Sequence, residues 1–167
     1  MGYVGLIGFS TPAGGTVTFT NLGNNGYVEC TTGANAGGLV GCCMSSACTF
    51  IITNCYSMAT IVGTKENGAF SGWLGSNAVL TNCWAGTELA GTESGKEFCR
   101  FSSNATFNNC WTVQGTQVNN FPAEQIETGQ LAWRMNGEKF TSPIWYQNLN
   151  EGDTHPVADS NRGVVYY

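Results

Sequence analysis

The sequence predicts a mainly β protein: a parallel β-helix-like solenoid of about four coils, followed by a small helix-plus-strand C-terminal cap. Three observations lead to this prediction. A short strand-like segment recurs along residues 1–117. Turn-favouring Gly, Asn, Thr and Ser are abundant beside β-branched and aromatic residues that favour strands. After Gln117 the pattern changes, so we divide the chain into repeats over 1–117 and a cap over 118–167.

The recurring segment has the form apolar, any residue, Asn, Cys, aromatic. Three copies and one weaker copy lie at residues 52–56, 80–84, 107–111 and 19–22. Their asparagines follow one another at intervals of 33, 28 and 27 residues. The apolar runs have the length of strands and lack helical spacing. Repeats of this size predict stacked coils in which equivalent residues lie above one another.

A second element precedes each copy. It reads Gly-Leu-x-Gly at residues 5–8 and 38–41, in both cases 16 residues before the asparagine. We assign the third copy to residues 72–75, where Trp73 replaces the leucine, and a degenerate fourth copy to residues 98–101. The chain therefore reads as four two-part coils, with insertions of varying length between the parts.

The asparagine of each repeat is predicted to make a bend. The residue two positions before it and the residue directly after it are apolar, and strand alternation would send them to opposite faces. A corner lets both point inward, and Asn is among the few residues that tolerate left-handed backbone geometry. We therefore expect a column of asparagines whose side-chain amides hydrogen-bond between coils: Asn21, Asn54, Asn82 and Asn109.

The eight cysteines invite structural and metal-binding interpretations. One repeat position is occupied by Cys55, Cys83 and Cys110, which predicts a buried column of small apolar side chains. A local disulfide between Cys42 or Cys43 and Cys48 is the alternative in a secreted protein. Zinc is disfavoured because His155 is the only histidine and paired Cys-x-x-Cys motifs are lacking.

The two elements together resemble the GLUG motif repeat of bacterial surface and secreted proteins, which also occurs in non-catalytic parts of some IgA-specific metallopeptidases. The resemblance covers about residues 5–115 and departs from the motif at Trp73 and at residues 98–101. It implies a repetitive, extracellular, β-helical module, and it brings no catalytic residues with it.

The C-terminal segment is predicted to cover the open end of the stack, because unpaired strand edges at a repeat terminus are usually covered. Phe121-Pro122 opens a helical stretch that Gly129 interrupts and that Asn136-Gly137 ends. Residues 144–146 and 164–167 are predicted as two short strands around a polar loop. This part also resembles the tail that often follows such repeats.

The aromatic residue after each cysteine is the candidate for binding. If the cysteine points inward, then Tyr56, Trp84 and Trp111 point outward and form a stripe along the stack. Flat aromatic faces suit the apolar faces of sugar rings, and contiguous exposed apolar surface usually marks an interaction site. The alternative is that loops, the cap or a neighbouring domain cover the three rings.

Catalytic interpretations find little support in the sequence. His155 lies beside Asp153, Asp159 and Ser160, but nothing marks an activated nucleophile or an oxyanion hole. A polysaccharide lyase needs a carboxylate cluster for calcium and a basic residue near the substrate. The charged cluster in the repeats, Glu93, Lys96, Glu97 and Arg100, is explained more simply as a solvated turn. We expect neither an enzyme nor a bound cofactor or metal.

Charge and hydropathy restrict the partners. A net charge of −5 with six Lys and Arg disfavours nucleic acid and anionic membrane surfaces, and no apolar run is long enough to span a membrane. No signal peptide precedes the first repeat, so we expect the start to lie inside a longer protein. The sequence favours a non-catalytic, adhesin-like or ligand-presenting module at the bacterial cell surface or secreted, linked to other domains and binding a glycan or a host or bacterial surface protein. A structural spacer and a degenerate lyase-like domain are the alternatives.

Overall fold

The computed structural model describes residues 2–10, 12–31, 35–44, 47–63, 66–75, 77–87, 89, 98–139 and 141–162. The chain divides into two compact units, residues 1–120 and 121–167. All strand pairings between the named strands are parallel, and the helices found among the described residues are short segments of the second unit. The prediction of a mainly β fold is therefore confirmed, and the parallel sheets are compatible with a β-helix-like fold.

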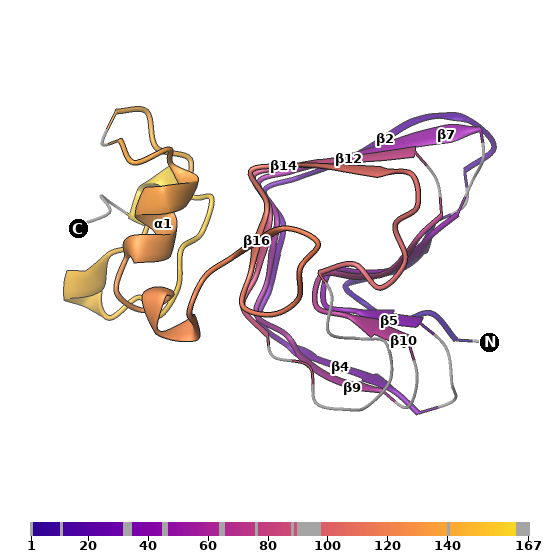
Figure 1. Cartoon of the computed structure of the whole chain (residues 1–167), viewed down its shortest axis with the longest axis horizontal. Coiled ribbons are helices and arrows are strands. Elements are labelled where there is room, and N and C mark those ends of the chain that lie inside the picture. Colours follow the sequence, from indigo (N-terminus) through magenta and orange to yellow (C-terminus); the bar gives the residue numbers. More distant parts are fainter. Residues whose placement is uncertain are drawn as a thin grey trace. The chain divides into compact units, whose positions relative to one another are not determined.

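Four strands of the first unit form the sheet that precedes the asparagines: β2 (Gly15–Thr20), β7 (Cys48–Thr53), β12 (Asn77–Thr81) and β14 (Ala105–Asn108). They pair in register one repeat apart, so that Thr53 lies between Thr20 and Thr81. Figure 1 looks along the stack, and there the four strands lie nearly on top of one another. Along each strand, more buried apolar side chains alternate with more exposed residues, as expected when one face is buried.

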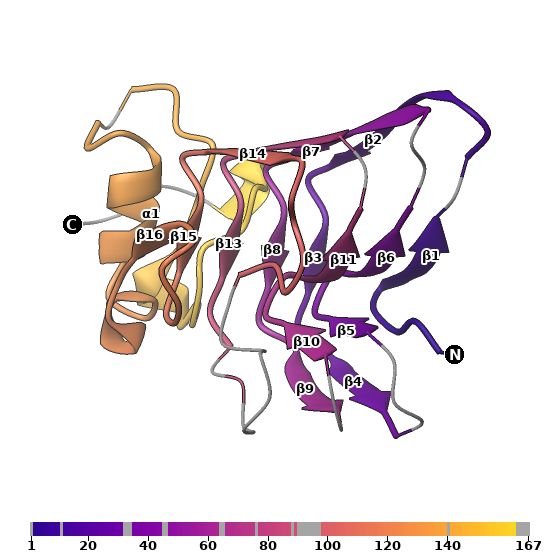
Figure 2. The same ribbon diagram turned by 45° about the vertical axis from the view of Figure 1, so that its right-hand side comes forward.

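A second parallel sheet begins directly after each asparagine. Its order is β16 (Asn119–Asn120), β15 (Trp111–Thr112), β13 (Trp84–Ala85), β8 (Tyr56–Ser57) and β3 (Gly23–Asn24). The chain thus turns from one sheet into the next within two residues of each asparagine. Figure 2 shows these strands side by side along the stack.

Three further parallel sheets join neighbouring passes, and each contains strands from only two or three of them among the described residues. One contains β1 (Ile7–Ser10), β6 (Val40–Cys43) and β11 (Ser71–Leu74). The other two are pairs: β5 (Asn35–Gly37) with β10 (Glu66–Gly68), and β4 (Tyr27–Cys30) with β9 (Thr60–Gly63). Glycines sit where β5 and β6 cross closely; a Cβ at Gly37 would overlap the carbonyl oxygen of Val40.

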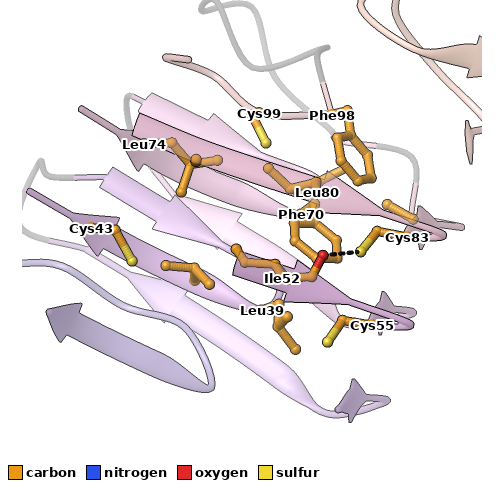
Figure 3. Close-up of a cluster of buried hydrophobic side chains, with 14 of the residues drawn as sticks. Leu39, Cys43, Ile52, Cys55, Phe70, Leu74, Leu80, Cys83, Phe98 and Cys99 are labelled. Atoms are coloured by element: carbon orange, nitrogen blue, oxygen red, sulfur yellow. Dashed lines mark hydrogen bonds between the residues drawn. The ribbon is translucent and has the colours of Figure 1, made fainter. Parts of the chain in front are cut away.

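The core of the first unit is built from columns of like residues. Phe50, Ile52 and Leu80 have no exposed surface, and neither do Leu39, Phe70 and Phe98. Figure 3 shows Ile52 and Leu80 pointing into the same interior as Phe70 and Phe98. Burying such side chains stabilises the fold by roughly 1.5–3 kcal/mol each, and the columns repeat that contribution at every pass.

The register of the third pass corrects one sequence assignment. Val40 pairs with Ile7 on one side and with Ser71 on the other, and the amide of Leu39 donates to the carbonyl oxygen of Phe70. Residues 38–41 are therefore equivalent to residues 69–72, and the assignment to residues 72–75 is wrong by three positions. The leucine position of the motif points into the core and needs a large apolar side chain, which Phe70 supplies. Gly72, predicted as the first glycine of the element, is its last residue.

The fourth pass is displaced in the same way. Ser71 bridges Cys99, so Phe98 takes the leucine position and stacks on Phe70 with ring centroids 4.7 Å apart. The assignment of this copy to residues 98–101 is therefore one residue too late, because it puts Phe98 at the first glycine of the motif instead of at the leucine. Phenylalanine replaces leucine in this column without changing its role in the interior.

The second unit contains the short helices. They are η1 (Ala123–Gln125), α1 (Gln130–Met135), η2 (Leu149–Glu151) and η3 (Ser160–Arg162). Gly129, with φ of 80°, separates η1 from α1, and Asn136 and Gly137 end α1. None of the described helices is long and apolar enough to cross a membrane.

The predicted strands of this unit are only partly present. Residues 144–146 form no strand, and a single antiparallel bridge joins Tyr146 to Val157. The reason is local, because the side chain of Asn136 already accepts from the amides of Ile144 and Trp145 and donates to the carbonyl of Trp145. Residues 164–167 lie outside the described residues. The role of this unit as a cap stays a prediction. The boundary between the two compact units lies after Asn120, three residues beyond the boundary that the sequence predicts after Gln117.

Candidate binding surface

The structure brings the four predicted asparagines into one column. Their φ angles lie between 49° and 54°, which is the left-handed region. The Nδ2 amide of each of the last three donates to Oδ1 of the asparagine one pass earlier, at 3.0 Å for Asn54 to Asn21, 3.4 Å for Asn82 to Asn54 and 2.9 Å for Asn109 to Asn82. Each asparagine therefore makes a bend through its backbone, and its side chain hydrogen-bonds to the neighbouring pass.

The three cysteines after these bends form an interior column. Cys55 and Cys83 are fully buried and Cys110 is 2% exposed. Each sulfur lies within hydrogen-bond distance of two carbonyl oxygens: for Cys83 these belong to Thr81 and to Ile52 of the previous pass, at 3.4 and 3.5 Å. Burial raises the pKa of the Cys83 thiol well above its usual value. All eight cysteines of the chain are buried free thiols in the structure, including Cys42, Cys43 and Cys48.

The predicted aromatic stripe is present as a column, but it is not exposed. Trp84 pairs with Tyr56 and Trp111 in the second sheet, and the rings of Tyr56 and Trp84 stack with centroids 5.2 Å apart and planes 9° apart. Tyr56 is 9% exposed, Trp84 is fully buried and Trp111 is half-buried. The expected exposure of the stripe is therefore not found, and the rings are covered, as in the alternative; a binding role of these three residues stays a prediction.

The stacking itself explains part of this burial. Rings that follow one another at the spacing of parallel strands cover each other's faces, so a side chain directed away from the core still loses its flat surface. Tyr56 also lies against Gly23 of the first pass, where a Cβ would overlap its ring, and its hydroxyl accepts from Nδ2 of Asn25 at 3.2 Å. Outward direction alone does not predict an exposed aromatic face.

A different set of aromatic residues is exposed, and the sequence analysis missed it. We call Tyr3, Phe9, Trp73 and Phe101 the aromatic surface. Phe9 is 49% exposed and Phe101 is 36% exposed, while Tyr3 and Trp73 are half-buried. Tyr3 stacks on Phe9 with ring centroids 5.0 Å apart, and Trp73 stacks on Phe101 at 4.4 Å.

The sheet of β1, β6 and β11 positions this surface. Cys42 pairs with Phe9 on one side and Trp73 on the other, so the two ring pairs flank a small side chain. Cys42 has no exposed surface and lies outside the core cluster, which includes its neighbour Cys43. Burial raises the pKa of Cys42 to about 11, so its thiol is protonated at neutral pH. The aromatic surface therefore carries no thiolate in its middle.

One cation adjoins the rings. The guanidinium carbon of Arg100 lies 5.4 Å from the ring centre of Trp73, within the range of a cation–π interaction. Nη1 of Arg100 also donates to Oδ1 of Asn35 at 3.2 Å, which fixes the guanidinium beside the indole. Flat rings next to a fixed hydrogen-bond donor suit a ligand with an apolar face and polar edges, as a sugar ring has.

The aromatic residues of this surface are visible in the sequence, but they do not align with one another when the repeats are aligned on their asparagines. Aromatic residues at positions 9, 73 and 101 share no spacing to their asparagines, since the intervening segments differ in length. Only the corrected alignment, with Phe70 and Phe98 in the leucine column, places Trp73 beside Phe101.

The histidine and the carboxylates considered for catalysis in the second unit take part in local contacts. Asp153 accepts from Nη1 of Arg162 at 2.9 Å and from the amide of Asn148, while the half-buried His155 has Thr154 at 3.1 Å from Nδ1. The pKa of His155 is lowered, mainly by burial. Over the described ranges, no three His, Cys, Asp or Glu side chains are placed to hold a metal ion. Glu93, Lys96 and Glu97 lie outside those ranges.

Comparisons of the chain with protein-family models, with curated proteins and with solved structures each found no match. The likeness to GLUG repeats therefore rests on the recurring residues themselves.

Proposed function

We propose that this chain is a non-catalytic, GLUG-like β-solenoid module of a bacterial surface or secreted protein, and that it binds glycan through the aromatic surface. The observation that carries the proposal is the exposure of Phe9 and Phe101 together with two stacked ring pairs, each of which has one ring on the sheet of β1, β6 and β11. Clustered exposed aromatic side chains are uncommon on protein surfaces without a ligand.

The position of the rings supports a polymeric ligand. Phe9 and Trp73 lie on strands that are two strand spacings apart, which is about 9.6 Å. Because the two rings of each pair cover each other's faces, the pairs offer their exposed apolar edges to neighbouring sugar units of one chain. The guanidinium of Arg100 adds donors at one end of the surface. An adhesin-like or ligand-presenting role follows from such an elongated site.

The experiment is a glycan array followed by titration of the best ligand. We expect Trp73→Ala and Phe101→Ala each to weaken binding at least about tenfold, because aromatic side chains in contact with a ligand commonly contribute more than 1 kcal/mol. Tyr27→Ala is the matched control, since Tyr27 is an aromatic residue that is 61% exposed on a different sheet. Equal loss in all three variants, or no glycan bound at all, contradicts the proposal.

A structural spacer is the second candidate. It is favoured by the uninterrupted asparagine column, which joins every pass of the first unit to its neighbour. A blank glycan array combined with a cooperative, stable unfolding transition would favour the spacer over the binding module.

A further inference from the structure

We infer that the outward face of the sheet formed by β2, β7, β12 and β14 binds to the surface of ice crystals. We call it the threonine face. It lies on a different sheet from the aromatic surface, so the inference goes beyond the proposed glycan site. It rests on the register of the four strands, on the chemistry of their outward side chains, and on the flatness of the sheet.

The outward side chains of these strands form a two-dimensional array. Because the strands pair in register, every second residue stands in a column that crosses the sheet. Neighbours within a column are about 4.8 Å apart, and columns are separated by two residues along the strand, about 6.6 Å. Further coils would lengthen the columns but would not cover the face, since coils stack at the strand edges. The columns are Thr16, Thr49 and Asn77; Thr18, Ile51, Val79 and Thr106; Thr20, Thr53, Thr81 and Asn108.

Hydroxyl and methyl groups dominate the array, and charge is absent from it. Most of its members are threonine, and none of the four strands contains an Asp, Glu, Lys or Arg. The outward side chains are half-buried or exposed, so their outer ends meet solvent. Among the described residues, no threonine hydroxyl of this face hydrogen-bonds within the protein. Each hydroxyl is therefore available to water and stands beside a methyl group.

The sheet is flat, as contact with a crystal surface requires. Neighbouring strands normally rotate by about 20–25° relative to one another, which twists a larger sheet. In the view along the stack, these four strands instead lie nearly on top of one another (Figure 1). The asparagine column directly after them links each pass to the next through Asn54, Asn82 and Asn109. Side-chain ladders of this kind stabilise flat sheets, so the spacing of the array is held constant.

An ice crystal fits this array better than a soluble ligand does. Oxygen atoms on a face of hexagonal ice repeat in two dimensions at intervals similar to those of the threonine face. Hydroxyl groups at such intervals hydrogen-bond to water molecules in lattice positions, and the methyl groups fill the spaces between them. Each contact is weak, but contacts made side by side on one rigid surface act together. A charged partner finds no complementary charge on this face.

The test is thermal hysteresis, the difference between the melting point and the freezing point of a single ice crystal in a solution of the protein. We expect the wild type to lower the freezing point alone, because adsorbed protein blocks growth. Ile51→Lys should lose most of this activity, since a long hydrated side chain in the middle of the face prevents contact. Val62→Lys is the matched control and should stay fully active. Val62 is also β-branched and is 44% exposed, against 37% for Ile51, but it lies in β9.

Circular dichroism of both variants checks that they fold. Incorporation of the amine-labelled wild type into a slowly growing ice crystal is a second measurement, and it depends on no variant. A wild type that shows no hysteresis and is excluded from the ice overturns the inference. A folded Ile51→Lys that remains fully active also overturns it, and so do equal losses in the two lysine variants.

Discussion

Nδ2 of Asn54 donates to Oδ1 of Asn21 at 3.0 Å, and both residues hold φ at 54°. One residue type thus satisfies two requirements at the same position: it adopts the left-handed backbone of the bend, and it links its pass to the previous one. Other residues meet one of these requirements but not both, and glycine is the clearest example.

This relationship separates two contributions to stability. Asn54→Ala should destabilise the protein by about 2–3 kcal/mol, because alanine strains the left-handed backbone by roughly 1–2 kcal/mol and two amide hydrogen bonds are lost. Asn54→Gly keeps the backbone and should cost clearly less. Urea unfolding of both variants measures the difference. If the two lose the same stability, backbone strain is not what selects asparagine here.

Gly23 makes room for the ring of Tyr56, which a Cβ at this position would overlap. Gly23→Ala should therefore destabilise by about 1–3 kcal/mol through overpacking. Gly14→Ala is the control, because its Cβ would meet the carbonyl oxygen of Ala47 at an ordinary 3.6 Å. In the double variant with Tyr56→Ala the cost of Gly23→Ala should vanish. Additive costs in that cycle would rule out the ring as the cause.

Cys42 should make stability depend on pH in the alkaline range. Its pKa rises from 9.0 to about 11 in the folded protein through burial, so above pH 9.0 the unfolded chain releases a proton that the folded chain keeps. Stability is therefore full below pH 9.0 and falls by up to about 1.4 kcal/mol per pH unit as the pH rises towards 11. Urea unfolding of wild type and Cys42→Ala between pH 8 and pH 11 isolates this contribution. Parallel pH profiles for the two proteins would contradict it.

Asn136 organises the loop of the second unit with one side chain. Its Oδ1 accepts from the amides of Ile144 and Trp145, at 2.9 and 3.0 Å, and its Nδ2 donates to the carbonyl of Trp145 at 2.8 Å. Asn136→Ala should cost about 2–3 kcal/mol, since three backbone groups lose their partner. Asn136→Asp keeps the acceptor and should lose less. The fluorescence of the buried Trp145 during unfolding is a suitable readout, and unchanged transitions would show that water replaces the side chain.

The repeat made much of the first unit predictable. Asn54, Asn82 and Asn109 recur with cysteine after them, and this local pattern sufficed to place the bend and the interior thiols. The Gly-Leu-x-Gly element predicted less well, because Phe70 and Phe98 fill the leucine column and the glycines at positions 72 and 75 imitate the motif. A short motif tolerates such shifts, whereas the hydrogen-bonded register does not.

The exposure of aromatic side chains could not be predicted from the repeat. Trp84 follows the repeat and is fully buried, whereas Phe9 lies outside the recurring segment and is 49% exposed. Exposure depends on which rings stack and on what lies beside them in neighbouring passes, and this information is spread over residues far apart in sequence. The second unit has no repeat at all, so its strand prediction at residues 144–146 rested on β propensity, which the side chain of Asn136 overrides.

The intervals of 33, 28 and 27 residues between the asparagines have an evolutionary consequence. Each pass advances the axis by one strand spacing, about 4.8 Å, however many residues it contains. Gene duplications that add a pass would lengthen the stack of strands by a fixed step, and insertions between the strands of a pass would widen that pass without changing the step. The number of passes, which sets the length of the stack, and the insertions within each pass can therefore change independently in evolution.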